Sequence, residues 1–138
     1  MFPPYLGDKV PMEAKEQAIE VYRICKGGFV DKCSFLNTYE EYEQRGDLDR
    51  LDLTEPGAYS LSCYEKRRDA RRKLMFFTKR NPKAIAACGT TEPRCGPCQR
   101  TRERIKTCKD SHVDWWLYCD ATPWRYFKEV TLDEAKEV

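Results

Sequence analysis

Cysteine is the residue type in this chain with the widest scope for chemistry, because a thiol can form a disulfide, bind a metal ion or act as a nucleophile. The 138 residues include eight cysteines. An even number this large is typical of proteins that fold in an oxidising compartment. We therefore expect that all eight cysteines form disulfides, although the sequence does not show which pairs with which. They are Cys25, Cys33, Cys63, Cys88, Cys95, Cys98, Cys108 and Cys119.

Cys95, Gly96, Pro97 and Cys98 have the same sequence as the active site of thioredoxins, where a helix N-terminus makes the first thiol a nucleophile. That site follows a buried strand, whereas Thr-Thr-Glu-Pro-Arg precedes it here and predicts a loop. Framework disulfides are favoured. A thiol–disulfide oxidoreductase, with Cys95 as nucleophile and Cys98 as resolving thiol, remains the main alternative.

Metal binding is a further alternative. Cys88, Cys95, Cys98 and Cys108 include one CxxC pair, whereas zinc sites normally use two. His112 is the only histidine, which excludes His-rich metal sites, and a lone histidine beside a strand is usually a surface or edge residue. We expect no metal ion, no other cofactor and no catalytic residue.

Charge is unevenly distributed along the chain, which has a formal net charge of +2. Residues 65–109 contain 15 Lys and Arg against four Asp and Glu. A basic run at 67–73 precedes Phe76 and Phe77, a mixture that single-strand nucleic-acid binders also use. A solvated basic face above a buried strand has the same pattern and is favoured. Nucleic acid is not an expected partner, and whether 66–109 is a binding face stays open.

Periodicity predicts the elements that position these residues. Apolar residues at helical spacing predict a helix over 12–26, and Asn37 and Gly46 delimit a second, short helix. Aromatic and alternating residues predict strands over 58–64, 113–119 and 124–130, the last two as a hairpin. Residues 73–78 suit a strand, 67–73 are as readily helical, and 131–138 suit a last helical turn. The expected fold is one α+β domain over 1–138, with an antiparallel sheet of about four strands covered by helices and stapled by disulfides.

The segment Trp124-Arg125-Tyr126-Phe127-Lys128 resembles the short Trp-Arg-aromatic-x-basic signature of the Leptosphaeria avirulence-and-suppressing family of fungal effectors. Chain length and cysteine number agree with that family. The resemblance implies a secreted α/β protein of a plant-associated fungus, with a sheet of about four strands covered by helices and no known enzymatic activity. It also implies that this segment is a sheet strand, with Trp124 and Tyr126 on one face.

The expected function is therefore recognition of a protein. The resemblance implies that the partner is a host plant protein or an immune receptor, and that the protein is detected by such receptors or masks the detection of others. No apolar run approaches the ~20 residues of a membrane helix. The residues after Met1 do not form a signal peptide, so secretion into the apoplast, with entry into host cells as a further option, is inferred from cysteine content. We expect a monomer.

Overall fold

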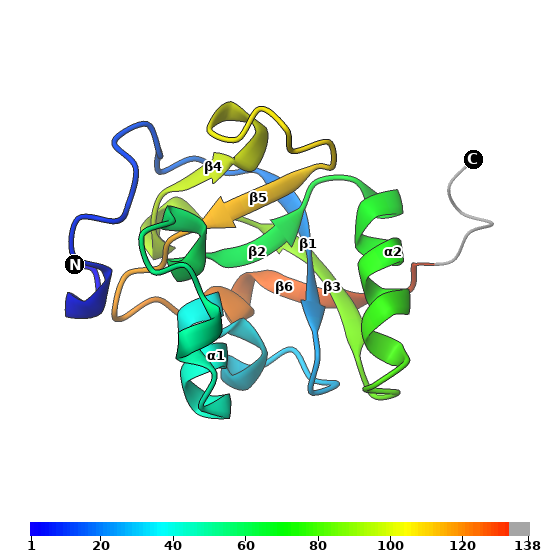
Figure 1. Ribbon diagram of the computed structural model, residues 1–138. Helices are drawn as coiled ribbons and strands as arrows, with labels where there is room; N and C mark the ends of the chain where they lie inside the picture. The colour runs from blue at the N-terminus through cyan, green and yellow to red at the C-terminus, as the bar shows by residue number, and fades with distance from the viewer. Residues whose placement is uncertain (133–138) are drawn as a thin grey trace.

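The computed structural model describes residues 1–132, which are built around a six-stranded antiparallel sheet with the order β4-β5-β2-β1-β3-β6 (Figure 1). The strands are β1 (Glu20–Cys25), β2 (Leu61–Tyr64), β3 (Ile85–Thr90), β4 (Cys98–Arg100), β5 (His112–Trp115) and β6 (Phe127–Val130). The α-helices are α1 (Thr38–Arg45) and α2 (Arg67–Thr78). Short 3-10 helices connect them: η1 (Pro4–Leu6), η2 (Lys32–Phe35), η3 (Leu48–Arg50), η4 (Pro56–Tyr59), η5 (Pro93–Cys95), η6 (Thr101–Glu103) and η7 (Pro123–Tyr126).

The prediction of about four strands covered by helices and stapled by disulfides is wrong. The described residues contain six strands and two short α-helices, and all eight cysteines are free thiols. An even cysteine count indicates pairing only if the side chains meet in pairs. Here no disulfide joins them, although Cys25, Cys63, Cys95 and Cys98 are buried in one apolar cluster; Cys88 and Cys108 are half-buried, and Cys33 and Cys119 are exposed.

The predicted helix over 12–26 is also wrong, because its second half is the central strand β1. β1 pairs with β3 over its full length, from Glu20 opposite Thr90 to Cys25 opposite Ile85. Apolar residues at helical spacing in this segment also alternate as a strand does, and the Val-Tyr-Arg-Ile sequence favours extended structure. Pairing with the distant strand β3, together with these strand-forming residues, therefore outweighs the helical spacing.

The two α-helices follow local rules. Asn37 caps α1, its side chain accepts from the backbone of Glu40, and Gly46 ends the helix with φ 74°, so the predicted short helix is confirmed. In α2 the apolar residues Ala70, Leu74 and Phe77 share one face and pack on the sheet. The strand predicted over 73–78 is therefore wrong, and the helical alternative for 67–73 holds.

The predicted hairpin of 113–119 with 124–130 does not form, because β5 pairs with β2 and β4 whereas β6 pairs with β3. β5 ends at Trp115, and the chain turns out of the sheet at Trp116. Both tryptophans are fully buried, but in different apolar clusters. Trp115 packs with Phe127, and Trp116 packs with Leu6. The strand predicted over 58–64 is shorter in the structure, because residues 58 and 59 belong to η4 and β2 begins at Leu61. The helical turn predicted for 131–138 lies almost wholly outside the described residues.

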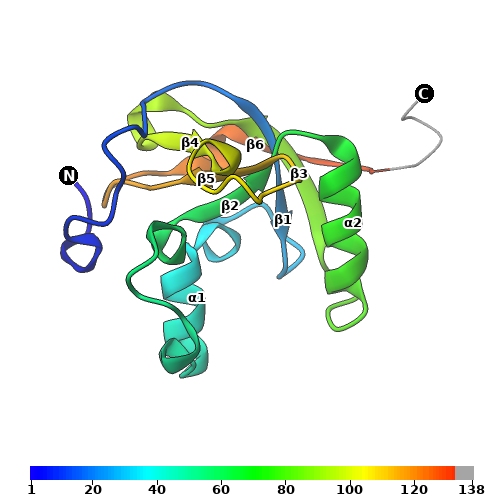
Figure 2. The ribbon, with the colours of Figure 1, turned by 45° about the horizontal axis from the view of Figure 1, so that its top comes forward.

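β1 and β2 are neighbours in the sheet but share a single register pair, Tyr22 with Tyr64. Figures 1 and 2 show β1 then running away from β2 and ending between α1 and α2. The buried side chain of Arg23 fills the opening and donates from Nη1 to the Ser62 carbonyl of β2 at 3.0 Å. One side chain therefore replaces the missing backbone pairing.

Arg23 also ties this opening to the segment before α1. Its Nε donates to the Ser34 carbonyl at 3.0 Å and its Nη2 to the Leu36 carbonyl at 3.2 Å. The charge is compensated by Glu41 of α1, whose carboxylate lies 3.7 Å from Nη2. Arg23 thus sets the position of α1 against the sheet.

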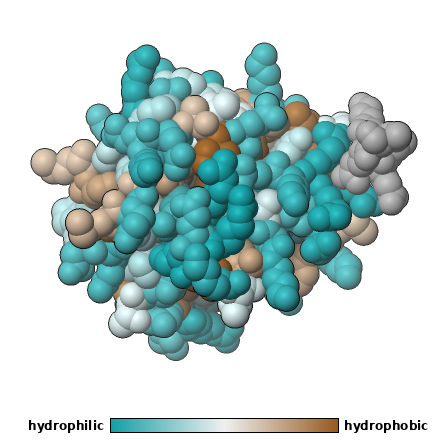
Figure 3. Space-filling model, turned by 90° about the horizontal axis from the view of Figure 1, so that it is seen from above, coloured by the Kyte–Doolittle hydropathy of each residue, from teal (hydrophilic) through white to brown (hydrophobic). Residues whose placement is uncertain are grey.

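The described residues include no helix long and apolar enough to cross a membrane. The face seen in Figure 3 is largely hydrophilic, and its apolar side chains form small separate areas. Apolar burial is concentrated on the two sides of the sheet, around Trp115 on one and around Ile24 and α2 on the other.

Replacing Arg23 by methionine is expected to lower the free energy of unfolding by at least about 3 kcal/mol, because three carbonyl groups lose a charged donor and Glu41 loses a buried partner. Urea unfolding followed by circular dichroism measures the change. Arg94→Met is the matched control, since that side chain is 87 % exposed and should change stability by less than about 0.5 kcal/mol. Equal effects of the two substitutions would contradict the bridging role.

Candidate functional site

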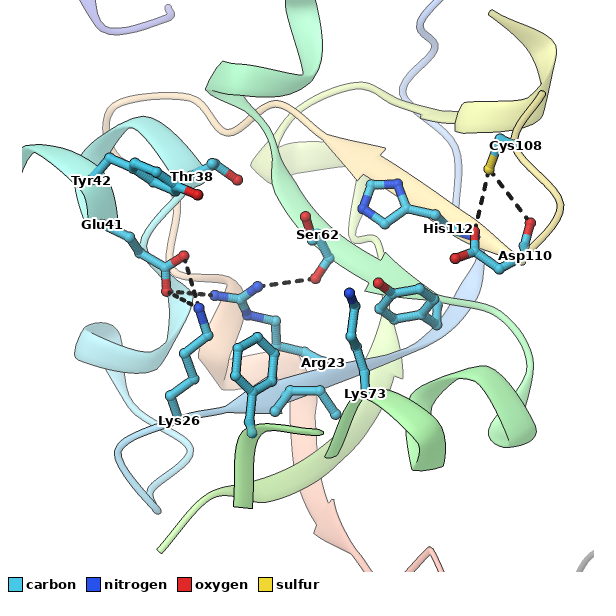
Figure 4. Close-up of a pocket in the computed structure, with 13 residues that line it drawn as sticks. Arg23, Lys26, Thr38, Glu41, Tyr42, Ser62, Lys73, Cys108, Asp110 and His112 are labelled. Atoms are coloured by element: carbon cyan, nitrogen blue, oxygen red, sulfur yellow. Dashed lines mark hydrogen bonds and ion pairs between the residues drawn. The ribbon is translucent and has the colours of Figure 1, made fainter. Parts of the chain in front are cut away.

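A pocket of about 420 Å³ opens between α1 and α2, where β1 and β2 separate (Figure 4). β1 and the residue after it supply Arg23 and Lys26, and α1 supplies Glu41. The opposite side is formed by β2, by β5 and by Lys73 of α2. The pocket is thus built by the same opening that Arg23 bridges.

One wall is a compact charged cluster. Glu41 lies 3.4 Å from the ammonium of Lys26 and 3.7 Å from the guanidinium of Arg23, so one carboxylate serves two cations. The Lys26 ammonium also lies 4.4 Å from the centre of the Phe77 ring. Burial lowers the pKa of Lys26, and Glu41 opposes that shift. This wall carries one positive charge in excess.

The facing wall is a hydrogen-bonded chain that starts at His112. Nδ1 of His112 lies 2.5 Å from Oγ1 of Thr101, and that hydroxyl lies 2.8 Å from a carboxylate oxygen of Asp114. Asp114 is fully buried and forms a 3.0 Å ion pair with Arg104. A carboxylate only accepts, so the single Thr101 proton goes to Asp114 and His112 must donate from Nδ1. The free lone pair of the imidazole is therefore on Nε2.

Burial lowers the pKa of His112. The carboxylates of Asp114 and Asp110 oppose this shift, whereas Lys73 and Arg104 add to it. The neutral imidazole, with Nδ1 protonated, is therefore the form that the folded protein favours near pH 7. Figure 4 shows its ring directed into the pocket, toward the same space as the side chains of Ser62 and Lys73.

Four polar groups around this space have no hydrogen-bond or ion-pair partner among the described residues. They are the Ser62 hydroxyl, the Tyr64 hydroxyl, the Lys73 ammonium and Nε2 of His112. Burial, followed by the charges of Asp110 and Asp69, raises the pKa of Tyr64, so its hydroxyl stays protonated. The group thus offers two hydroxyls, one cation and one acceptor to whatever enters the pocket.

Cys108 also lines the pocket, but its surroundings do not favour a nucleophilic thiolate. Its Sγ lies 3.3 Å from a carboxylate oxygen of Asp110. Burial and the hydrogen bond to Asp110 both raise the pKa of Cys108, which favours the thiol over the nucleophilic thiolate. The lining is therefore better suited to holding a polar ligand than to nucleophilic chemistry.

The Cys95–Cys98 tetrapeptide lies in the core, away from this pocket. It ends η5 and starts β4, and burial raises the pKa of both thiols. Gly96 has φ 142°, and a Cβ there would lie 2.0 Å from the Trp116 carbonyl. Its own carbonyl accepts from the Trp115 indole at 3.0 Å. The conformation of this tetrapeptide is thus set by packing against the two tryptophans.

The other predicted residues are dispersed. Among the described residues no group of three or more His, Cys, Asp or Glu side chains is placed to hold a metal ion, so the zinc alternative has no site. The family-like segment is not one strand: Trp124, Arg125 and Tyr126 lie in η7, and Phe127 and Lys128 begin β6. Phe127 is buried and Trp124 half-buried, whereas Arg125, Tyr126 and Lys128 are exposed.

Sequence reasoning did not find the pocket. The sequence predicts a surface or edge position for His112 and a solvated basic face for Lys73, whereas the structure places both at the pocket. The alternation of Ser62 with Tyr64 and of His112 with Asp114 was the available indication, because paired strands place such residues on one face. Comparison of the chain with protein-family models, with curated proteins and with solved structures found no match.

The pKa of His112 is expected to lie below its ordinary value of about 6.5, with the proton of the neutral ring on Nδ1. Because the unfolded chain takes up this proton more readily, stability should fall as the pH drops below about 6.5. Nuclear magnetic resonance titration of the only histidine measures the pKa, and imidazole nitrogen shifts identify the tautomer.

Thr101→Val and His112→Gln serve as controls for this titration. The first removes the hydroxyl that holds Nδ1, so the tautomer preference should weaken. The second removes the titrating group, so the part of the acid destabilisation that comes from His112 should disappear. A pKa above 6.5, or a proton on Nε2, would contradict the hydrogen-bonded chain as described.

Proposed function

We propose that this chain is a secreted binding protein of the effector type that recognises a host or partner protein through the outer face of α2 and the adjoining pocket. The observation that carries the proposal is the exposure of Met75 and Phe76, 54 % and 52 %, in the middle of a basic helix. Both lie beside the basic residues for which the sequence favours a solvated face.

The surroundings of Phe76 resemble the centre of a binding surface. Its ring centre lies 5.8 Å from the Lys73 ammonium and 5.9 Å from the Arg80 guanidinium. Aromatic residues beside arginine are the composition enriched at interaction hot spots. Burying a Phe side chain in a partner contributes about 1.5–3 kcal/mol. Lys73 also belongs to the pocket, which joins the two parts into one surface.

The family-like segment supports the same class of function. Arg125, Tyr126 and Lys128 are exposed, and the Tyr126 side chain is 40 % accessible. The resemblance to the Leptosphaeria avirulence-and-suppressing family adds the expectation of a host plant protein or immune receptor as partner. The proposal includes secretion to the apoplast, action as a monomer and no enzymatic activity. The oxidoreductase alternative gains no support, because burial raises the pKa of both Cys95 and Cys98.

Phe76→Ser is expected to weaken binding to a host protein partner at least tenfold, because it removes the exposed apolar surface without changing the core. Partners captured from plant extract by the wild-type protein would be purified, and their affinities for both proteins measured by calorimetry. Met12→Ser is the control, because Met12 is an apolar residue that is 98 % exposed and lies outside α2 and the pocket. It should leave the affinity unchanged. A partner that binds all three proteins equally would contradict the assignment of this surface.

A further inference from the structure

We propose that the pocket between α1 and α2 binds a phosphate monoester, held by Lys73, Ser62, Tyr64 and His112. The inference rests on the proposed binding function, because it names the chemical group that the pocket beside α2 receives. Each of these side chains presents a polar group without a partner among the described residues. They come from three elements, α2, β2 and β5, so they surround the space from several directions.

Charge selects an anion. The pocket is lined by three cations and two carboxylates. The lining therefore carries one positive charge in excess, with Glu41 shared by Arg23 and Lys26 and with Asp110 accepting the backbone N–H of His112 at 3.1 Å. Lys73 has no carboxylate partner among residues 1–132, so its charge remains for a ligand.

The combination of donors with an acceptor selects a phosphate monoester over a carboxylate. Lys73, Ser62 and Tyr64 each donate, and the two oxygens of a carboxylate could accept from all three, but an ionised carboxylate has no proton to donate to Nε2 of His112. Nε2 of His112 adds an acceptor, which matches the P–O–H group of a monoester monoanion. A phosphate therefore uses all four groups at once.

The size and the apolar part of the lining indicate an ester with an organic body. A volume of about 420 Å³ lies in the range of pockets that hold small organic ligands, and it exceeds the need of a lone anion. Ile24, Tyr42 and Phe77 supply apolar surface beside the polar groups. An aryl phosphate, whose ring would lie against these side chains, is the best probe.

Binding is expected to be linked to one proton. In the complex one proton lies between Nε2 of His112 and a phosphate oxygen. Before binding, this proton is carried either by the ester or by the imidazole. At high pH neither carries it, and a lone pair would face a dianion. Affinity should fall as the pH rises from about 6 to about 8, across the second pKa of a phosphate ester. The charged and titratable groups that surround His112 are Asp110, Asp114, Lys73, Arg104, Tyr64 and Cys108.

The test is a titration of the full chain with phenyl phosphate at pH 6.5, followed by the resonances of His112 and of the pocket backbone. Lys73→Met should weaken binding at least tenfold, and Ser62→Ala severalfold. Lys79→Met, which removes an exposed lysine just after α2 that does not line the pocket, should leave binding unchanged. Circular dichroism melting shows whether each variant is folded.

Three results would overturn the inference: no binding of phenyl phosphate, benzoate bound as tightly as phenyl phosphate, or equal loss with Lys73→Met and Lys79→Met. A further arm compares phenyl phosphate with a phosphotyrosyl peptide. Tighter binding of the peptide assigns the phosphate to a partner protein, and equal binding assigns it to a small molecule. Both of these results support the phosphate site.

The same variants separate this inference from the proposed function. Phe76→Ser should weaken the protein partner at least tenfold yet change the affinity for phenyl phosphate much less than Lys73→Met does, since Phe76 does not line the pocket. If phenyl phosphate fails to bind while the partner still requires Phe76, the phosphate site is refuted and the protein-binding function stands. If Phe76→Ser leaves the affinity for the protein partner unchanged while Lys73→Met weakens phenyl phosphate binding, the protein-binding surface is refuted and the phosphate site stands.

Discussion

The buried guanidinium of Arg23 holds together two parts of a sheet that backbone pairing joins at one position. β1, β3 and β6 form one part and β4, β5 and β2 the other, with Tyr22 opposite Tyr64 as the register pair between them. A buried charge is costly unless each of its donors is used, and Arg23 donates to three carbonyl groups while Glu41 compensates its charge. Because those partners lie on β2, on the segment before α1 and on α1 itself, one side chain sets the width of the opening and the position of a helix.

A second buried network fixes the far side of the same opening. Asp114 accepts hydrogen bonds from Ser60, Thr101 and Arg104, which joins β5 to the segments before β2 and after β4. His112 is attached to this network through Thr101, so its ring orientation depends on groups that lie behind it. The two walls of the pocket are therefore held by separate networks, one around Arg23 and one around Asp114. The charge without an ion-pair partner among residues 1–132 is that of Lys73 on α2.

The elements predicted correctly are those specified by neighbouring residues. The boundaries of α1 follow from Asn37, Glu40 and Gly46, all within one short segment. β1 was missed because its apolar residues also have helical spacing, whereas pairing with β3, some 60 residues later, decided the outcome. The strands predicted over 113–119 and 124–130 form only at residues 112–115 and 127–130, and their partners are other strands than the predicted ones.

The site was less accessible to sequence reasoning than the fold. Arg23 occurs among apolar residues, and in a predicted helix such a residue is assigned to the solvent side. Its bridging role exists only because β1 and β2 separate, which no local pattern indicates. The cysteines misled for a related reason: their number suggested pairing, whereas burial places Cys25 and Cys63 in the core as small apolar side chains.

The distribution of satisfied and unsatisfied polar groups separates structure from function in this protein. The deeply buried polar side chains Arg23, Asp69 and Asp114 all have several partners, as stability requires. The pocket differs, because Ser62, Tyr64, Lys73 and His112 each present a polar group there without a partner among residues 1–132. None of these four groups is a buried atom without a partner, so water can reach them and a ligand can replace that water. Position, more than residue type, is therefore the reason why we propose His112 and Lys73 as ligand-binding residues, whereas Cys95 and Cys98 pack in the core.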